Sequence, residues 1–251
     1  MGTLDDRVAI VTGGARGLGR AYCRGLAREG CRVAVADIAD PSTVVEEIAA
    51  AGGHAMAVPV DVSEEASTSA MARAVQERFG RIDVLVNNAA YYTAMQHAPF
   101  DELGVKEWDQ SFAVNVRGPW LCAKAVAPFM RSRRYGKIIN ISSMTVNDGT
   151  PNLLHYVATK AAVVGLTRGL ARELGGDGIA VNTVTPDYIP HDRDYAARQP
   201  EWLEDWIVSR RCFKRGEAPD DMVGVIVFLA GPGSDFITGQ NIAVNGGSAF
   251  F

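Results

Sequence analysis

A phenol and an ammonium group share one stretch of predicted helix. Residues 156–160 read YVATK, with Tyr156 four positions before Lys160. Side chains at i and i+4 lie side by side on a helix, one turn apart. The pKa of a free phenol is too high for an efficient base near neutral pH, and a nearby cation lowers it. Taken alone, the pair fits a core tyrosine beside a solvated lysine, and the rest of the sequence must decide whether the cation serves the phenol.

A glycine-rich turn near the N-terminus is the second candidate site. Residues 12–19 read TGGARGLG, between a predicted strand and a predicted helix. Glycines there allow the backbone to approach a pyrophosphate closely, and the helix N-terminus offers free N–H groups to it. Asp37, 24 residues past Gly13, ends the next strand, where a carboxylate accepts bonds from the ribose and repels a 2′-phosphate. The pattern predicts NAD as cofactor, although Arg16 in the turn could instead bind a 2′-phosphate.

Short apolar strands alternate with helices along the whole chain and must position these residues. Strands this apolar are buried on both faces, as in a parallel sheet covered by helices. The pattern predicts a Rossmann-type, doubly wound parallel α/β sheet of about seven strands in a single domain, residues 1–251, whose ligands bind at the carboxyl ends of the strands. The strands are predicted at 8–12, 32–37, 54–62, 82–90, 136–143, 179–186 and 241–247. Helices are predicted at 101–114, 116–133, 154–174 and 219–230, with an irregular region at 187–218.

Composition excludes several classes of function. Of 251 residues, 47% are hydrophobic and 22% charged, and the net charge of −4 argues against a nucleic acid or an acidic membrane surface as partner. No apolar stretch is long enough to span a bilayer, and the N-terminus is acidic where a signal peptide is basic, so we expect a cytoplasmic protein. The four Cys and four His lack metal-ligand spacing, so we expect reduced thiols and no metal.

Taken together, the motifs resemble the short-chain dehydrogenase/reductase family. The resemblance covers nearly the whole chain, in order and spacing. It is carried by the turn at 12–19, Asp61, NNAA at 87–90, Asn115, Ser143, YVATK at 156–160 and ITGQNIAVNGG at 237–247. It implies hydride transfer between NAD and a secondary alcohol or ketone. Two other interpretations stay open: a lyase, epimerase or isomerase on the same scaffold, and a non-catalytic dinucleotide-binding protein.

The resemblance also implies roles for four catalytic residues. Tyr156 would exchange the proton, while Lys160 and the positive nicotinamide lower its pKa. Lys160 would also hold the nicotinamide ribose. Ser143 would bond the substrate oxygen, and its neighbour Ser142 is less suited because adjacent strand residues face opposite ways. Asn115 would orient a water that links Lys160 to solvent.

The cofactor set implied by the resemblance departs from the family in two places, and the smaller departure is Ala90, which stands where the family usually has Gly. The set comprises Gly13, Arg16, Gly17, Leu18, Gly19, Asp37, Ile38, Asp61, Val62, Asn88, Ala89, Ala90, Tyr156, Lys160, Pro186, Asp187 and Ile189. Asp187 stands where the family usually has Gly, and His191 where it has a Thr that bonds the nicotinamide carboxamide. Either the loop folds differently here, or Asp187 or His191 binds a polar group of the substrate.

Substrate contacts are expected from the ends of the later strands and from a lid segment at about 187–215. The candidates are Thr145, Tyr91, His155, Tyr188, His191 and Trp202, together with Tyr92, Asn147 and Trp206. Trp202 and Trp206 have i,i+4 spacing, which also fits packing of a lid helix onto the body. The resemblance further implies a homotetramer or homodimer.

Overall fold

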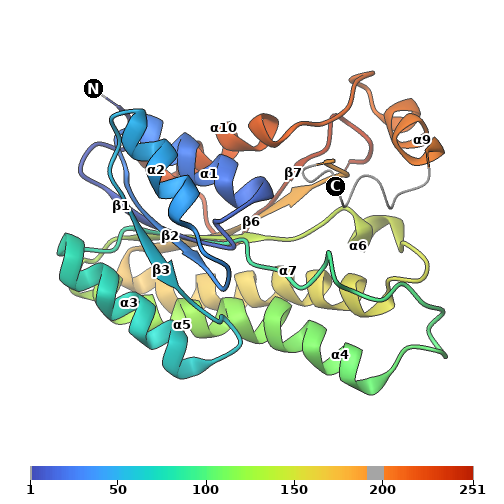
Figure 1. The fold of residues 1–251 in the computed structure, drawn as a ribbon, viewed down its shortest axis with the longest axis horizontal. Helices are drawn as coiled ribbons and strands as arrows, with labels where there is room; N and C mark the ends of the chain where they lie inside the picture. Colours follow the sequence, from blue (N-terminus) through green and yellow to red (C-terminus); the bar gives the residue numbers. More distant parts are fainter. Residues whose placement is uncertain (1, 191–200, 251) are drawn as a thin grey trace.

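Seven parallel strands form one sheet with helices on both faces, which confirms the predicted fold (Figure 1). The computed structural model describes residues 2–190 and 201–250. The strand order is β3-β2-β1-β4-β5-β6-β7, so the direction of winding reverses between β1 and β4. The strands are β1 Val8–Thr12, β2 Arg32–Asp37, β3 Ala55–Pro59, β4 Val84–Asn87, β5 Gly136–Ile141, β6 Ile179–Pro186 and β7 Asn241–Val244.

Two hydrophobic cores explain why the central strands are apolar along their whole length. On one face, β1 and β4 contribute Ile10 and Leu85, which pack with residues of the helices there. On the other face the same strands contribute Val11 and Val86 to the second core. Alternate residues thus serve opposite faces, and each strand must be hydrophobic throughout.

The helices divide between the two faces of the sheet. In Figure 1, α1, α2 and α10 lie on one face and α3, α4, α5 and α7 on the other. Their bounds are α1 Gly17–Arg28, α2 Ser42–Ala50, α3 Glu65–Phe79, α4 Val105–Phe112, α5 Gly118–Arg133, α6 Thr145–Asp148, α7 Leu154–Leu174, α9 Trp202–Arg210 and α10 Pro219–Ala230. Helix α9 lies inside the region predicted to be irregular, and the short α6 was not predicted.

A turn of π-helix at Ala113–Arg117 joins α4 to α5. The sequence pattern predicts two separate helices here, whereas the chain stays helical and widens by one residue in the turn. Such turns are frequent at functional sites because they displace one side chain from the regular helical path. The displaced stretch contains Asn115.

Buried polar side chains link the sheet to α7 behind the site. The Asn87 amide donates to Asn140 Oδ1 at 2.8 Å, and the Asn140 amide donates to Thr167 Oγ1 at 2.8 Å. Thr183 Oγ1 donates to the same Thr167 oxygen at 2.7 Å. Polar groups in a core are tolerated when they are hydrogen-bonded, and such networks specify one arrangement of the elements they join.

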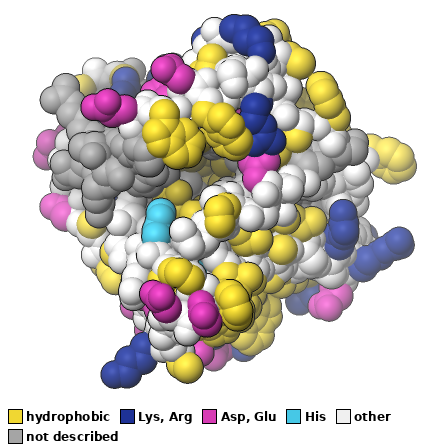
Figure 2. All heavy atoms as spheres, turned by 90° about the vertical axis from the view of Figure 1, so that its right-hand side faces the viewer, with side chains coloured by type: hydrophobic (Ala, Val, Ile, Leu, Met, Phe, Trp, Pro, Cys, Tyr) yellow, Lys and Arg dark blue, Asp and Glu magenta, His cyan; other side chains and the backbone are white. Residues whose placement is uncertain are grey.

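The face at the carboxyl ends of the strands is hollowed. Figure 2 shows this face, with hydrophobic side chains gathered around the hollow. Within residues 2–190 and 201–250, no helix combines the length and apolarity needed to cross a membrane. Cys23, Cys31 and Cys122 are buried, and Cys212 is exposed.

Candidate active site

The glycine turn is shaped for close backbone approach. Gly13 and Gly17 have φ values of 64° and 55°, in the left-handed region that favours glycine. A Cβ on Gly13 would lie 2.8 Å from the Cα of Ala89, and a Cβ on Gly19 would collide with the carbonyl oxygen of Gly13. Helix α1 begins at Gly17 without a side-chain cap, so its first N–H groups remain available for a phosphate.

A cavity of about 350 Å³ runs from this turn across the carboxyl ends of the strands. The glycine turn, Asp37 after β2 and Tyr156 on α7 all line this one cavity. The cavity therefore offers a glycine cradle at the pyrophosphate position and an acid at the adenosine ribose position of a dinucleotide. The residues that line it include Gly13, Arg16, Gly17, Leu18, Asp37, Ile38, Asp61, Val62, Asn88, Ala89, Ala90, Tyr156, Lys160 and Pro186.

Asp37 is held at its end of the cavity by the main chain. Its Oδ2 accepts from the N–H of Ala15 at 2.9 Å, and its Oδ1 accepts from the N–H of Ala39 at 3.0 Å. Each carboxylate oxygen still has a lone pair for a ribose hydroxyl. Arg16 lines the same cavity, and its Nη2 lies 3.4 Å from Thr93 Oγ1.

Asn88 and Ala89 are fixed against the glycine turn. The Asn88 amide donates to the carbonyl oxygens of Thr12 and Gly13 at 3.0 and 3.1 Å. The main-chain N–H groups of Asn88 and Ala89 both donate to Thr12 Oγ1 at 3.1 Å. The end of β4 and the glycine turn therefore form one rigid wall of the cavity.

Tyr156 and Lys160 meet as their spacing predicts. Lys160 Nζ lies 5.6 Å from the centroid of the Tyr156 ring and donates to the carbonyl oxygen of Ile141 at 2.9 Å. Both side chains are almost fully buried, 8% and 4% exposed, although both border the cavity. The pair connects α7 to the end of β5.

Burial shifts both groups toward their neutral forms. Desolvation raises the pKa of Tyr156 far above its ordinary value, the nearby Tyr92 raises it further, and a hydrogen bond with Ser143 opposes the shift. Desolvation lowers the pKa of Lys160 to about 8. In the cofactor-free protein the phenol is therefore protonated, and the ammonium is easily deprotonated.

The two serines after β5 have different partners. Ser143 is within hydrogen-bonding reach of Tyr156, and its Oγ accepts from Thr145 Oγ1 at 3.1 Å. Ser142 borders the cavity, but its Oγ donates to the carbonyl oxygen of Lys160 at 2.9 Å. Ser142 thus supports α7, and Ser143 is the serine that lies with the phenol.

Asn115 ties the π turn to the loop after β4. Its Oδ1 accepts from the N–H of Tyr91 at 2.7 Å, and its Nδ2 lies 3.2 Å from the Tyr91 carbonyl oxygen. Nδ2 also lies 3.3 Å from Thr159 Oγ1, next to Lys160 on α7. The Asn115 amide thus holds the backbone of Tyr91 and contacts α7 through these protein groups.

Three predicted cofactor residues lie outside the cavity lining. Gly19 faces the glycine turn itself, where only a hydrogen fits. Ile189 is 4% exposed and packs in the core with Val184 and Met222, because the chain turns inward after β6. The carboxylate of Asp187 pairs with Arg211 at 3.2 Å instead of pointing at the cavity.

Several predicted substrate residues are also turned away from the cavity. His155 is fully buried, with Nε2 3.9 Å from Glu107 Oε1, because its position on α7 faces α4. Burial lowers its pKa. Trp202 and Trp206 on α9 are 62% and 47% exposed and contact each other edge to face. Neither indole is therefore buried against the body of the protein, which was the alternative interpretation of their spacing.

Of the other substrate candidates, Tyr91 and Tyr92 are the ones that line the cavity. The Tyr91 hydroxyl lies 3.1 Å from Glu107 Oε2. Thr145 bonds Ser143 without lining the cavity. Asn147 lines a separate hollow beside α7 and β7. Tyr188 follows Asp187, and His191 lies outside the described residues.

Sequence reasoning missed six residues that complete the lining: Val60, Thr93, Gln110, Val114, Ile141 and Ser142, the last of which is disfavoured against Ser143 by its position on the strand. Val60 and Ile141 end buried runs, so their place at the carboxyl ends of strands was a usable signal. Thr93 comes from the loop after β4, Gln110 from α4 and Val114 from the π turn, and no local pattern distinguishes them.

Comparisons with known proteins agree with this geometry. The model of the family described as enoyl-(acyl carrier protein) reductase matches residues 13–249. The 3-oxoacyl-[acyl-carrier-protein] reductase FabG of Staphylococcus epidermidis is 39% identical over 245 residues, covering 96% of this chain and 98% of that protein. Galactitol 2-dehydrogenase of Agrobacterium fabrum is 35% identical over 255 residues, covering 98% of each.

A solved structure shares the whole fold. The gluconate 5-dehydrogenase of Burkholderia cenocepacia, in complex with NADP and tartrate, superposes with a TM-score of 0.91 at 34% identity, covering 98% of this chain and 97% of that one. These relatives are oxidoreductases that span nearly all of this chain, and the glycine turn, Asp37, Tyr156 and Lys160 line one cavity here. The chain belongs to the short-chain dehydrogenase/reductase family.

Proposed function

We propose that the protein is an NAD-dependent dehydrogenase or carbonyl reductase for a secondary alcohol or its ketone, with Tyr156 as the acid/base. The observation that carries this proposal is the buried contact between Tyr156 and Lys160 at the edge of the cavity. A binding protein has no need to bury an ammonium beside a phenol, since burial disfavours the charge.

Tyr156 exchanges the proton of the substrate hydroxyl. Burial alone makes its phenol a poor base, so a cation must stabilise the phenolate. Lys160 is placed to do so through space, and its ammonium persists at neutral pH because its pKa is about 8. Ser143 bonds the Tyr156 hydroxyl and is placed to orient the substrate oxygen between them. NAD, when bound, supplies the carbon that accepts or returns the hydride.

Asn115 supports the proton path by holding its surroundings. Its amide fixes Tyr91 and contacts Thr159, the residue before Lys160. The π turn widens the helix at Asn115, opposite this part of α7. We assign the relay water to this position.

The preference for NAD rests on Asp37. Its carboxylate is fixed at the ribose end of the cavity and would repel a 2′-phosphate. Arg16, the group that could compensate, is directed toward Thr93. The similar gluconate 5-dehydrogenase holds NADP, so the fold by itself does not select the cofactor.

Two further expectations accompany this function. Trp120, Leu154 and Phe250 are exposed in the single chain, at 45%, 46% and 84%. Large apolar side chains on α5, on α7 and near the C-terminus suit contacts between subunits of a homotetramer or homodimer. We also propose that the enzyme works in the cytoplasm.

The direct test is a substrate screen with a matched inactive variant. Secondary alcohols, polyols, sugar acids and aromatic carbinols are incubated with NAD and NADP in parallel, and reduced nicotinamide is followed by fluorescence. Tyr156→Phe should lose about 10² to 10⁴-fold in turnover, as expected for a missing acid/base. Product formed without net nicotinamide change would indicate a lyase, epimerase or isomerase. Binding of NAD with no turnover of any substrate would indicate a binding protein.

A further inference from the structure

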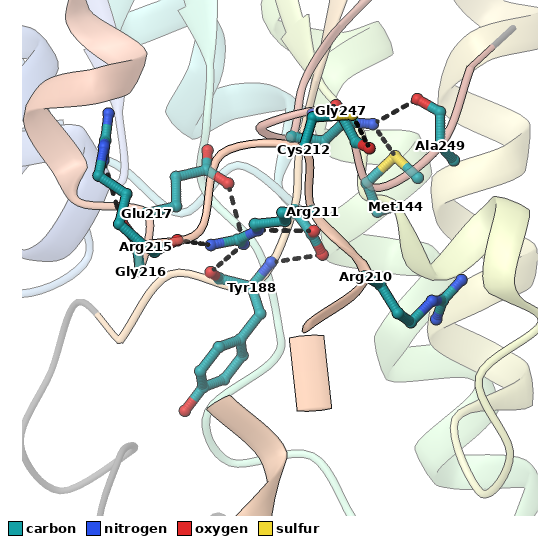
Figure 3. Close-up of polar contacts among 12 residues, drawn as sticks. Met144, Tyr188, Arg210, Arg211, Cys212, Arg215, Gly216, Glu217, Gly247 and Ala249 are labelled. Atoms are coloured by element: carbon teal, nitrogen blue, oxygen red, sulfur yellow. Dashed lines mark hydrogen bonds and ion pairs between the residues drawn. The ribbon is translucent and has the colours of Figure 1, made fainter. Parts of the chain in front are cut away.

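Two adjacent arginines end helix α9 and have opposite environments. Arg210 forms a surface pair with Asp148 at 3.1 Å, and both side chains are partly exposed, at 39% and 28%. Arg211 is 2% exposed and lies between the carboxylates of Asp187 and Glu217, at 3.2 Å from each. Asp187, Arg211 and Glu217 are called the Arg211 cluster below. Figure 3 shows the Arg211 guanidinium directed at Glu217 and at the carbonyl group of Tyr188.

The Arg211 cluster joins three segments that are far apart in the sequence. Besides the carboxylates, Arg211 donates to the carbonyl oxygen of Tyr188 at 3.0 Å and to that of Arg215 at 3.3 Å. Asp187 and Tyr188 follow β6, Arg211 follows α9, and Glu217 precedes α10. One planar side chain with fixed donor directions thereby sets the position of α9 relative to the sheet.

The attachment point is next to the reacting groups. Asp187 directly follows Pro186, which lines the cavity. The carbonyl oxygen of Pro186 accepts from the N–H of Met144 at 2.9 Å, and Met144 follows Ser143. If Arg211 moves, Asp187 and Pro186 can move with it, and the Pro186–Met144 hydrogen bond then transmits this movement to Ser143.

Tyr188 occupies the space between α9 and the catalytic end. Its ring points away from the Arg211 cluster in Figure 3. Burial raises the pKa of its hydroxyl, and the nearby Glu204 on α9 and Tyr92 in the cavity wall raise it further. Tyr188 thus lies near both elements, and its backbone is held by Arg211.

We propose that Arg211 is a positioning residue: it fixes α9 and Tyr188 against the end of β6, so that they form the outer wall of the alcohol site. The proposal rests on the dehydrogenase function given above. Buried ion pairs add little net stability because desolvation offsets their attraction, but they hold the geometry of their donors. Burial raises the pKa of Glu217 to about 8, and Asp187 adds to this shift while Arg211 opposes it.

The kinetic test compares Arg211→Met with Arg210→Met. Arg211→Met should lower kcat/KM for the alcohol by about tenfold to hundredfold, the loss expected when a reactant is misplaced by about 1 Å. The Kd for NAD should stay the same. Arg211→Lys keeps the charge but loses the fork of donors, so it should recover only part of the loss. Arg210→Met should match the wild type, because exposed ion pairs contribute little.

A stable apolar replacement separates positioning from stability. In Asp187→Leu/Arg211→Met/Glu217→Met, all three charges are removed together, which buried clusters tolerate well. We expect wild-type thermal stability with the kcat/KM defect retained. The proposal is overturned if this triple variant has wild-type kcat/KM. It is also overturned if the kcat/KM of Arg211→Met equals that of the wild type.

Hydrogen exchange keeps the test independent of the reaction. Backbone amides of α9 should exchange at least about tenfold faster in Arg211→Met than in Arg210→Met, since opening of α9 then costs less free energy. If the wild type oxidises no alcohol but this contrast is seen, the proposed function fails while the structural role of Arg211 stands. Equal exchange in the two variants overturns the role of Arg211 even in an active enzyme.

Discussion

The ring of Tyr92 lies against that of Tyr156, with centroids 4.5 Å apart and planes inclined by 36°. Both rings border the cavity, so the proposed acid/base group, Tyr156, has an aromatic wall on one side. Tilted aromatic pairs at this separation attract each other beyond simple burial of area. Tyr92 therefore restricts where a substrate can approach the Tyr156 hydroxyl.

The hydroxyl of Tyr92 should affect the pH dependence of oxidation. Tyr92 raises the pKa of Tyr156, so Tyr92→Phe, which keeps the ring, should lower it. Oxidation needs the phenolate, so kcat/KM should rise as the pH passes the pKa of Tyr156. In Tyr92→Phe this rise should occur at lower pH than in the wild type. The measurement is kcat/KM against pH. Tyr91→Phe is the control, because the Tyr91 hydroxyl bonds Glu107 instead. An unmoved limb in Tyr92→Phe would contradict the assignment.

Lys160 should make the stability of the cofactor-free protein depend on pH. Burial lowers its folded-state pKa from 10.5 to about 8, so between these values the unfolded chain binds more protons. The free energy of unfolding should then rise with pH across this window, by up to about 3 kcal/mol relative to Lys160→Met. Denaturant unfolding of both proteins at several pH values measures the difference, and other titrating groups cancel. Parallel curves would show that Lys160 is not desolvated as described.

Asp37 should control the choice of cofactor by its charge. Asp37→Asn keeps a side chain of the same shape and removes the repulsion of a 2′-phosphate, so the ratio of kcat/KM for NADP to that for NAD should rise at least about tenfold, equivalent to about 1.4 kcal/mol. Asp40→Asn is the matched control, since Asp40 is exposed and bonds Ser42. Equal ratios in Asp37→Asn and the wild type would refute the electrostatic basis of the preference.

Asn115 should matter to stability as well as to turnover. Asn115→Ala removes the groups that pair with the N–H and C=O of Tyr91, which should cost about 1–3 kcal/mol for each buried group left unsatisfied. Turnover should also fall, because the π turn beside Lys160 loses its tie to the loop after β4. Thr159→Val, which leaves the Tyr91 bonds intact, should be milder in both respects. The measurements are the thermal unfolding temperature and kcat of both variants. Equal losses in Asn115→Ala and Thr159→Val would contradict the role given to the Tyr91 bonds.

Local patterns were sufficient for the framework of the site. The acid/base pair needed only the helical repeat, because Tyr156 and Lys160 are neighbours on any helix that contains them. The glycine turn and Asp37 needed only the alternation of strand and helix, since carboxyl ends of parallel strands share one edge. The ends of β3 and β4 were placed too late by up to three residues, at 62 and 90 against Pro59 and Asn87. The residues beyond them leave the sheet to line the cavity.

The departure at Asp187 shows where the sequence was insufficient. Its sequence context left open whether the carboxylate served the substrate or a refolded loop. The structure pairs it with Arg211, a partner 24 residues away. No periodicity encodes such a contact, because it depends on where the chain returns after α9.

The sequence by itself determined the strand–helix alternation, the glycine-rich turn and the contact between Tyr156 and Lys160. All three follow from interactions between residues close in the chain. The tertiary structure decided which way each remaining side chain faces. It turned His155 toward Glu107, put Ile189 into the core and laid Tyr92 on Tyr156. These outcomes depend on packing between elements distant in sequence, and the free energy of that packing is not visible in any local pattern.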